Sequence, residues 1–383
     1  MSHVFRERLV FGFRIFLVAF FFVAMFRGPQ IVWLLLPPRW ADVVIVDKTM
    51  SHENYREHSG LTWLLTAMKV MRPGGLEYDE TRDYVGFDPR AHVGHDLAAK
   101  DLEKADILFF ADTYGVYKAD YLAIDDPNVL ERSRKLYGGL TLAEATAASD
   151  FVERGGTVIG EFNTFASPTE DAPRAKMEEL LGAHWSHWVG RYWKDLSDVT
   201  EVPGWLKRDH QRIFGRPLDA TGAALIFVLE DHDMVVLRTG QELAGDSLRI
   251  ERVADDKDPE RAKLPEAARY GYWFDVVQAG DADVLYEYVV PTIGDADKIL
   301  FKHGLNARFP AVLRHRRTKG SAWYFAGDFI DTSAERGDPH RAGLLWWRKI
   351  TMGDLDAPEG IFWGWYAPLL SRLIEPRVHP GRR

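Results

Sequence analysis

Three short apolar runs, each closed by an acidic residue, most constrain what this chain can fold into. They are residues 43–47 (VVIVD), 107–112 (ILFFAD) and 157–161 (TVIGE). Runs of this length and composition are typical of strands buried on both faces of a parallel sheet. Stretches with a helical period separate them, and parallel strands need such crossovers. The sequence therefore predicts an α/β fold with a doubly wound, mostly parallel, flavodoxin-like sheet.

Two helices are predicted between these runs. The first follows Ser59 and stops at the Pro-Gly-Gly of residues 73–75. The second begins at a capping box formed by Thr141 and Glu144, and Gly155 ends it. In doubly wound sheets, ligands bind outside the carboxyl ends of the strands. We therefore expect a site where the three apolar runs end.

The middle of the chain has a different character. Residues 183–193 (AHWSHWVGRYW) are aromatic and expected to be extended, and 224–240 (ALIFVLEDHDMVVLRTG) is typical of a hairpin. Residues 268–277 and 282–291 are predicted to be further strands. Together they predict a β-rich insertion at about 184–300.

After the insertion, residues 320–331 (GSAWYFAGDFID) are predicted to form a buried strand that ends at Asp328. We expect one elaborated α/β domain over residues 39–383. Its C-terminal part is helical in pattern and rich in tryptophan. Two roles are open for these side chains, core packing or an interfacial belt beside a membrane: Trp346, Trp347, Trp363 and Trp365.

The N-terminus is predicted to be a membrane anchor, residues 1–38. Residues 9–26 are almost continuously apolar, and about 20 such residues cross a bilayer, with a lower limit of about 17. Arg6 and Arg8 precede the span and Arg27 follows it, a weak bias toward an inside N-terminus. The main domain is then extracytoplasmic. The alternatives to a membrane anchor are a cleaved signal peptide and a peripheral or buried helix.

Composition excludes several classes of function. The net charge of −9 argues against binding to nucleic acid. The absence of cysteine excludes disulfides, thiolate metal sites and a cysteine nucleophile. The chain has no P-loop, no GxGxxG after a strand and no GxSxG, so the commonest nucleotide-binding and hydrolase motifs are missing. We predict no cofactor and assign no metal site.

The order of motifs resembles that of a known superfamily. Residues 101–115 (DLEKADILFFADTYG) are followed by a helix ending in FVERGG (151–156) and then by TVIGEFNTF (157–165). This succession resembles the class I glutamine amidotransferase-like superfamily, including its ThuA-like branch. Residues 314–329 (RHRRTKGSAWYFAGDF) resemble the late strand of ThuA-like proteins. The resemblance covers residues 40–182 and 308–331, and it implies an α/β domain with a strand-to-turn nucleophile elbow.

The resemblance fails at the catalytic residue. The position of the amidotransferase cysteine falls on Phe162, and phenylalanine cannot act as a nucleophile. The sequence around His340 (PHRAG) does not match the downstream His-x-Glu pair of that family. Glutamine amidotransferase activity is therefore not expected.

Polar residues gather at the predicted carboxyl edge of the sheet. They are Asp47, Asp112 and Glu161 at the ends of the three runs, with Lys48, Tyr114 and Asn163 beside them. Neighbouring carboxylates raise one another's pKa, which separates general acid from general base. Three roles are open: acid–base catalysis with Glu161 or Asp112 as base, binding of a divalent cation through oxygen ligands, or capping of helices.

The loop after the first run, residues 51–58 (SHENYREH), lies on the same predicted edge. His52 could act as an acid or base, and Glu53 could contact a ligand. Arg56 could pair with an anionic ligand or with one of the carboxylates. Asp328 could reach the same crevice if its strand joins the sheet. A solvated loop is the alternative reading of residues 51–58.

The residues leave three functions open. The first is a membrane-anchored, extracytoplasmic amidotransferase-like domain, without glutaminase activity, that binds a small molecule, a glycan or a protein partner at the carboxyl edge. The second is a hydrolase that uses the carboxylates on glycan or envelope material. The third is a structural subunit of an envelope assembly. In each case residues 9–26 contact the membrane.

Overall fold

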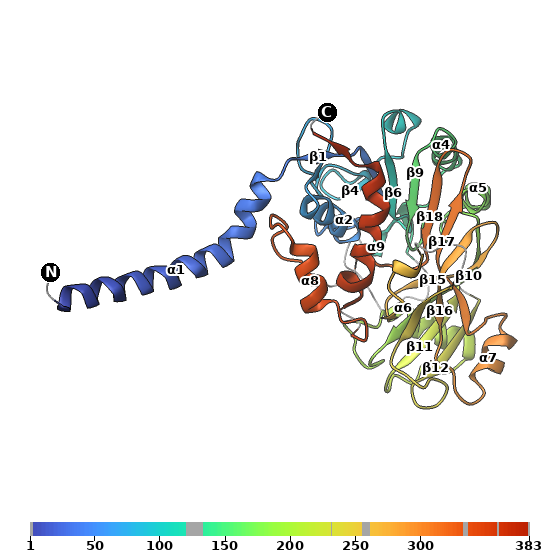
Figure 1. The fold of residues 1–383 in the computed structure, drawn as a ribbon. Coiled ribbons are helices and arrows are strands. Elements are labelled where there is room, and N and C mark those ends of the chain that lie inside the picture. Colours follow the sequence, from blue (N-terminus) through green and yellow to red (C-terminus); the bar gives the residue numbers. More distant parts are fainter. Residues whose placement is uncertain are drawn as a thin grey trace.

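The computed structural model describes residues 3–119, 133–230, 232–254, 261–331, 336–357 and 360–381 (Figure 1). A long N-terminal helix, α1 (His3–Leu35), projects from an α/β body. The structure confirms the mixed α/β fold and the apolar N-terminal helix. The sheets are mixed, and only half of the main sheet is parallel.

The main sheet has ten strands. In spatial order they are β14 (Ala267–Tyr270), β13 (Leu248–Arg252), β16 (Asp283–Val289), β17 (Arg308–Arg316), β18 (Ser321–Phe325), β9 (Thr157–Gly160), β6 (Ile107–Asp112), β2 (Val43–Asp47), β4 (Val85–Asp88) and β5 (Val93–Gly94). The five strands from β18 to β4 run parallel to one another, and the others pair antiparallel. The three apolar runs of the sequence are therefore the adjacent strands β2, β6 and β9.

Helices connect the parallel strands. α2 (Arg56–Ala67) follows β2 and begins three residues before Ser59, and α4 (Leu142–Glu153) joins β6 to β9. The predicted capping box at the start of α4 is confirmed, because Thr141 and Glu144 each bond to the backbone amide of the other. Between these helices and strands lie four short elements: β3 (Val70–Met71), η1 (Ala99–Leu102), β7 (Val116–Tyr117) and β8 (Lys135–Tyr137).

The middle of the chain forms strands in two sheets. β10 (Ala183–Trp193) coincides with the aromatic segment predicted to be extended, and it follows α5 (Asp171–Leu181). The predicted hairpin is the pair β11 (Ala224–Leu229) and β12 (Asp233–Arg238). With β15 (Phe274–Ala279) these strands make a four-stranded antiparallel sheet in the order β12-β11-β10-β15. β13, β14 and β16 instead extend the main sheet. Three helical segments accompany them: α6 (Gly204–Phe214), η2 (Arg261–Lys263) and α7 (Ala296–Lys302).

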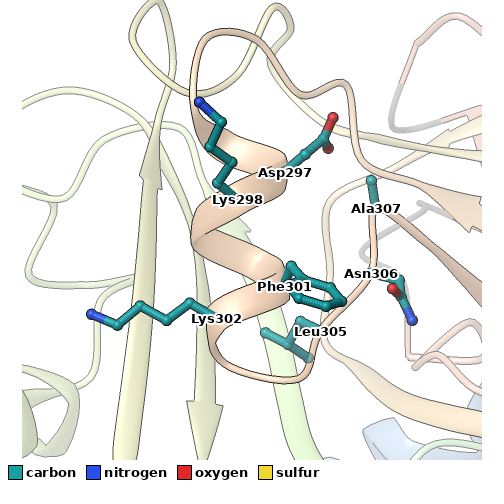
Figure 2. Close-up of a pocket in the computed structure, with 7 residues that line it drawn as sticks. All are labelled: Asp297, Lys298, Phe301, Lys302, Leu305, Asn306 and Ala307. Atoms are coloured by element: carbon teal, nitrogen blue, oxygen red, sulfur yellow. The ribbon is translucent and has the colours of Figure 1, made fainter.

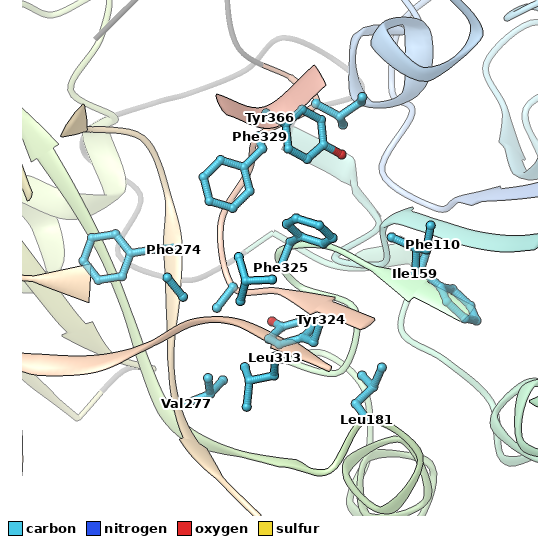
Figure 3. Packing of buried hydrophobic residues seen from close by; sticks show 14 of the residues in the cluster. Phe110, Ile159, Leu181, Phe274, Val277, Leu313, Tyr324, Phe325, Phe329 and Tyr366 are labelled. Carbon is cyan, nitrogen blue, oxygen red and sulfur yellow. The ribbon is translucent and has the colours of Figure 1, made fainter. Parts of the chain in front are cut away.

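The hydrophobic core joins both sheets. Figure 3 shows Phe110 and Ile159 of the parallel strands in the same cluster as Tyr324 and Phe325 of β18 and Phe274 of β15. The C-terminal region adds α8 (Leu344–Met352), a π-helical turn (Phe362–Tyr366), α9 (Ala367–Ile374), η5 (Glu375–Arg377) and β19 (His379–Pro380), which pairs with β1 (Arg39–Trp40).

The four C-terminal tryptophans take different places. Trp363 and Trp365 are buried in the core, whereas Trp346 and Trp347 on α8 are exposed. Core packing therefore accounts for two of the four side chains only.

The apolar part of α1 is longer than the sequence suggested. Residues Val10–Leu35 are long and apolar enough to cross a membrane, and none of its most apolar window is buried against the body. A signal sequence near the N-terminus would meet the same criteria. By its length and composition, this segment is thus compatible with membrane association.

Candidate functional site

The carboxyl edge of the parallel strands carries a group of five acidic side chains. They come from the start of α2, the end of β6, the residue after β9 and the loop after β18. We call this group the carboxylate cluster: Glu57, Asp112, Glu161, Asp328 and Asp331. One carboxylate oxygen of Glu57, one of Asp328 and one of Asp331 lie within 4.8 Å of one another. Asp112 and Glu161 are more deeply buried.

Arg56 contacts two members of the cluster directly. Its guanidinium pairs with Glu57 Oε1 at 3.0 Å and with Asp331 Oδ2 at 2.8 Å. The Arg56 side chain is 63% exposed, while those of Glu57 and Asp331 are 12% and 7% exposed. Arg56 therefore bridges two of the five carboxyl groups at a partly open surface, and the Arg336 guanidinium also attracts Asp331.

Burial and mutual repulsion raise the pKa of the cluster carboxyls. Burial raises the pKa of Asp328 most, followed by repulsion from Asp331 and Glu57. Burial is also the main effect that raises the pKa of Asp112, and repulsion from Glu57 is the next largest. The pKa of Asp331 rises to about 8, because burial and Glu57 outweigh the attraction of Arg56. Burial and repulsion thus favour the protonated form of these groups.

Two carboxylate oxygens in the cluster are buried without a hydrogen-bond partner in the described part of the chain. They are Glu161 Oε1 and Asp331 Oδ1. The other Glu161 oxygen accepts a bond of 3.1 Å from the Ile330 amide. Burial and then Asp328 raise the pKa of Glu161, against the pull of the Ile330 and Phe329 amides. Buried polar atoms are nearly always paired, so each unpaired oxygen requires an explanation, and a bound ligand is one.

Asp47 lies at the same edge but is engaged elsewhere. Its Oδ2 is 2.6 Å from His58 Nδ1, and its Oδ1 accepts the Thr49 amide. His58 Nε2 lies 2.8 Å from the Glu80 carbonyl oxygen, which only accepts, so this nitrogen is a donor. Burial lowers the pKa of His58, but the bond and attraction to Asp47 raise it more. Asp47 and His58 therefore form a buried ion pair outside the cluster.

The structure brings together only some of the predicted site residues. Asp112, Glu161, Arg56 and Asp328 meet in the cluster, and Asn163 donates to Asp112 Oδ2 at 3.3 Å. Tyr114 lies beside the cluster, because its amide donates to Asp112 Oδ1 at 2.6 Å while its ring packs on Tyr117.

The remaining predicted residues face elsewhere. Lys48 is buried and its ammonium binds Glu144 at the start of α4. His52 is exposed, and Glu53 pairs with Arg90 at the surface.

Sequence reasoning missed Glu57 and Asp331 as site residues. Asp331 follows Asp328 by three residues, so its position in the same acidic turn was a usable signal. Glu57 is adjacent to Arg56, and only the start and phase of α2 decide which of the two side chains faces inward.

The strand-to-turn junction after β9 differs from the expected elbow. Asn163, not Phe162, has the left-handed backbone conformation, with φ of 61°. Such a strained residue is where an elbow presents its nucleophile. Phe162 is buried and stacks on Trp273. Neither side chain is a nucleophile, and α5 begins only at Asp171.

Surface hollows lie away from the cluster. Figure 2 shows one along α7, lined by Phe301 and Leu305 with Lys298, Lys302 and three further residues. In Figure 1, α7 is at the end of the body remote from α1. A second hollow is lined by residues between Met71 and Arg82. Neither hollow includes a residue of the carboxylate cluster.

Comparison with known proteins gives distant structural neighbours. No protein-family model matches the chain. No curated protein matches its sequence. A β-galactosidase from Rahnella sp. R3 is 13% identical with a TM-score of 0.33, over 75% of this chain and 28% of that chain. A ThuA-like protein from Bacteroides uniformis ATCC 8492 is 10% identical with a TM-score of 0.36, over 83% of this chain and 95% of that one. The carbohydrate deacetylase Agd3 is 10% identical with a TM-score of 0.35, over 76% of this chain and 29% of that chain.

The chain thus spans less than a third of the length of the β-galactosidase that it matches.

Proposed function

We propose that this chain is a membrane-anchored protein whose extracytoplasmic α/β domain binds a small-molecule or glycan ligand at the carboxylate cluster, without glutaminase activity. The anchor is α1, whose apolar residues Val10–Leu35 are sufficient in length for a bilayer. The absence of a nucleophile at Phe162 and Asn163 supports the lack of glutaminase chemistry.

The strand order supports the position of this site. Read by their order in the chain, the parallel strands β4-β2-β6-β9-β18 are arranged 2-1-3-4-5, the order of flavodoxin-like sheets. We infer a flavodoxin-like core in a single domain of residues 39–383, with residues 184–300 inserted. In such a core the ligand is expected beyond the carboxyl ends of the strands, where the cluster lies.

The observation that carries the proposal is the gathering of five carboxyl groups at one edge of the sheet, where Arg56 pairs with Glu57 and Asp331 and two carboxylate oxygens are buried without a partner in the described part of the chain. Like charges in a buried site destabilise the fold, and such arrangements persist chiefly where function requires them. Buried carboxylates outside the cluster differ: Asp275 Oδ1 also has no partner among the described residues, whereas both oxygens of Glu144 are paired. Glu144 is fully buried but accepts bonds from Lys48 and the Leu97 amide.

Substitution Glu161→Gln tests whether the cluster is functional rather than structural. At pH 8 the amide removes a buried acid that burial and Asp328 disfavour, so we expect stability to rise by about 0.5–2 kcal/mol. Thermal unfolding of the full chain in detergent micelles at pH 8 measures this change.

Glu144→Gln is the matched control, because Glu144 is equally buried but paired with Lys48. This variant is expected to lose stability. A loss of stability in Glu161→Gln as large as that in Glu144→Gln would contradict the proposal.

A hydrolase is the second candidate, and one observation favours it. Asp331 Oδ1 is buried without a partner among the described residues, and burial raises the pKa of this carboxyl to about 8, which suits a general acid. The full chain should then release nitrophenol from at least one 4-nitrophenyl glycoside, and Asp331→Asn should lose that activity. No release from a panel of such glycosides would leave ligand binding as the function.

A further inference from the structure

Three carboxylates of the cluster have the spacing of metal ligands. Hard divalent cations bind oxygen ligands at about 2.0–2.6 Å, so two oxygens on one ion lie no more than about 5 Å apart. The ligand oxygens of Glu57, Asp328 and Asp331 lie within 4.8 Å of one another. One ion can therefore contact all three with small side-chain movements.

Buried unpaired oxygens provide a second and independent indication of a ligand. Asp331 is 9% exposed, and its Oδ1 has no partner among the described residues, while Oδ2 is held by Arg56. Behind these ligands, Glu161 is fully buried with Oε1 also unpaired, and Asp328 is the charged group that perturbs it most.

The charge of the site favours a cation. The five carboxyl groups outnumber the guanidiniums near them: Arg336 attracts Asp331, and Arg56 contacts Glu57 and Asp331 through a mostly exposed side chain that can turn away. A dication would replace that contact and offset the repulsion between Asp328, Asp331 and Glu57. The open side is provided by Glu57 and Asp328, which are only partly buried.

We propose that Glu57, Asp328 and Asp331 bind one divalent cation of the hard, oxygen-preferring class, Ca²⁺, Mg²⁺ or Mn²⁺, with Glu161 behind them. This inference rests on the proposed function in taking the cluster as the ligand site. Bound in this way, the cation frees Arg56 to contact an anionic or polar group of a second ligand.

Calorimetric titration of the chelator-treated full chain in detergent micelles with CaCl₂, MgCl₂ and MnCl₂ tests this site. We expect one ion per chain for at least one salt, and a binding affinity about tenfold or more weaker in Asp328→Asn. The control Asp195→Asn removes an exposed loop carboxylate and should bind as the unaltered chain does.

If Asp328→Asn fails to fold, Asp331→Asn replaces it. No binding of any of the three ions, or equal binding by unaltered chain and variant, would overturn the metal site. Stabilisation by Glu161→Gln without ion binding would overturn the metal site alone and leave the cluster as a site for another ligand.

Helix α8 carries an exposed apolar surface, which is independent of the carboxylate cluster. One side of α8 exposes three large apolar residues, which we call the α8 apolar face: Trp346, Trp347 and Ile350. Their side chains are 65%, 57% and 60% exposed. Contiguous exposed apolar residues of this size mark interaction surfaces.

The segment before α8 is attached to α1. Gln30 Nε2 donates to Asp338 Oδ2 at 2.9 Å, and the Ala342 amide donates to the Pro29 carbonyl at the same distance. The ring of Trp33 lies 4.7 Å from that of His340. These contacts hold α8 beside the end of α1 that enters the body, as Figure 1 shows.

The geometry points to the α8 apolar face lying in the headgroup region of the same bilayer that α1 spans. Tryptophan favours this region because its ring is apolar while its indole N–H stays hydrated. The last turn of α1 adds exposed apolar residues to the same end of the body, among them Leu34 and Leu35. The domain then rests on the membrane and does not hang from a free linker.

Site-specific fluorescence tests this contact, because the chain has no cysteine of its own. An environment-sensitive label on Ile350→Cys, in the full chain in phosphatidylcholine nanodiscs, should be quenched several-fold more by headgroup spin-labelled lipid than a label on Phe301→Cys. Phe301 is 79% exposed on α7, at the remote end of the body.

Equal quenching at both positions would overturn the proposal. A signal at position 350 that appears only when two chains share a disc would also overturn it, because a second copy would then cover the face. A label on Phe16→Cys reports the anchor separately: without deep quenching there, the membrane anchor itself fails.

Discussion

Replacing Lys48 with methionine is expected to lower the free energy of unfolding by about 3–5 kcal/mol. Lys48 is 1% exposed, and its ammonium contacts Glu144 Oε2 at 2.7 Å, Asp96 Oδ1 at 2.8 Å and the Gly139 carbonyl at 3.0 Å. Glu144 is fully buried, so removal of the ammonium leaves an uncompensated charge at the start of α4. Denaturant unfolding of the full chain in detergent micelles measures the loss.

The matched control is Lys298→Met, which removes a lysine from the exposed pair with Asp295 on α7. Exposed pairs contribute little, so a change below about 1 kcal/mol is expected there. Adding Glu144→Gln to Lys48→Met should restore part of the lost stability, because it removes the orphaned charge. Equal effects of Lys48→Met and Lys298→Met would refute a structural role for the buried pair.

The second large effect concerns pH. Asp275 on β15 is fully buried, and burial raises its pKa to about 6, against hydrogen bonds from the Tyr324 hydroxyl and the Asn163 amide. Between its unfolded pKa, about 4, and about 6, the folded chain holds a proton that the unfolded chain has released. The native state binds more protons in this window, so stability falls as pH rises, by about 1.4 kcal/mol per pH unit.

Burial also raises the pKa of other carboxyls in this chain. The contribution of Asp275 is therefore measured as the difference in unfolding free energy between Asp275→Asn and the unaltered chain. The stability of Asp275→Asn relative to the unaltered chain should increase by about 2 kcal/mol between pH 4 and pH 6.5. Tyr324→Phe removes a donor that lowers the pKa of Asp275, and it should extend the window to higher pH. A stability difference for Asp275→Asn that is constant across this range would refute the assignment.

Local patterns predicted the individual elements well. The runs ending at Asp47, Asp112 and Glu161 are adjacent parallel strands, and the capping box of α4 is present. These features depend on residues within one turn or one strand, so the sequence contains their cause. The mixed sheet was not predicted. Its antiparallel half depends on β17 pairing with β16 on one side and with β18 on the other. Pairing between strands leaves little trace in any single segment.

The site shows the same division. Asp112, Glu161 and Asp328 were predicted as candidate site residues and meet in the cluster, since each ends or follows a strand that reaches one edge of the sheet. Asp47 ends its strand too, but His58 from the first turn of α2 binds it. Lys48 is the next residue, and its side chain runs to α4 instead of the cluster. The directions in which neighbouring side chains such as those of Asp47 and Lys48 point are set by packing across the sheet.

The sequence by itself determined the apolar N-terminal segment, the exclusion of cysteine chemistry and the acidic ends of the buried strands. Each of these is a property of residue type and local period. Only the tertiary structure decided that Glu57 meets Asp328 and Asp331, residues more than 250 positions away. Strand order, strand register and the rotational phase of α2 fix that meeting. All three are set by which apolar faces bury against each other, and this choice depends on the whole chain at once.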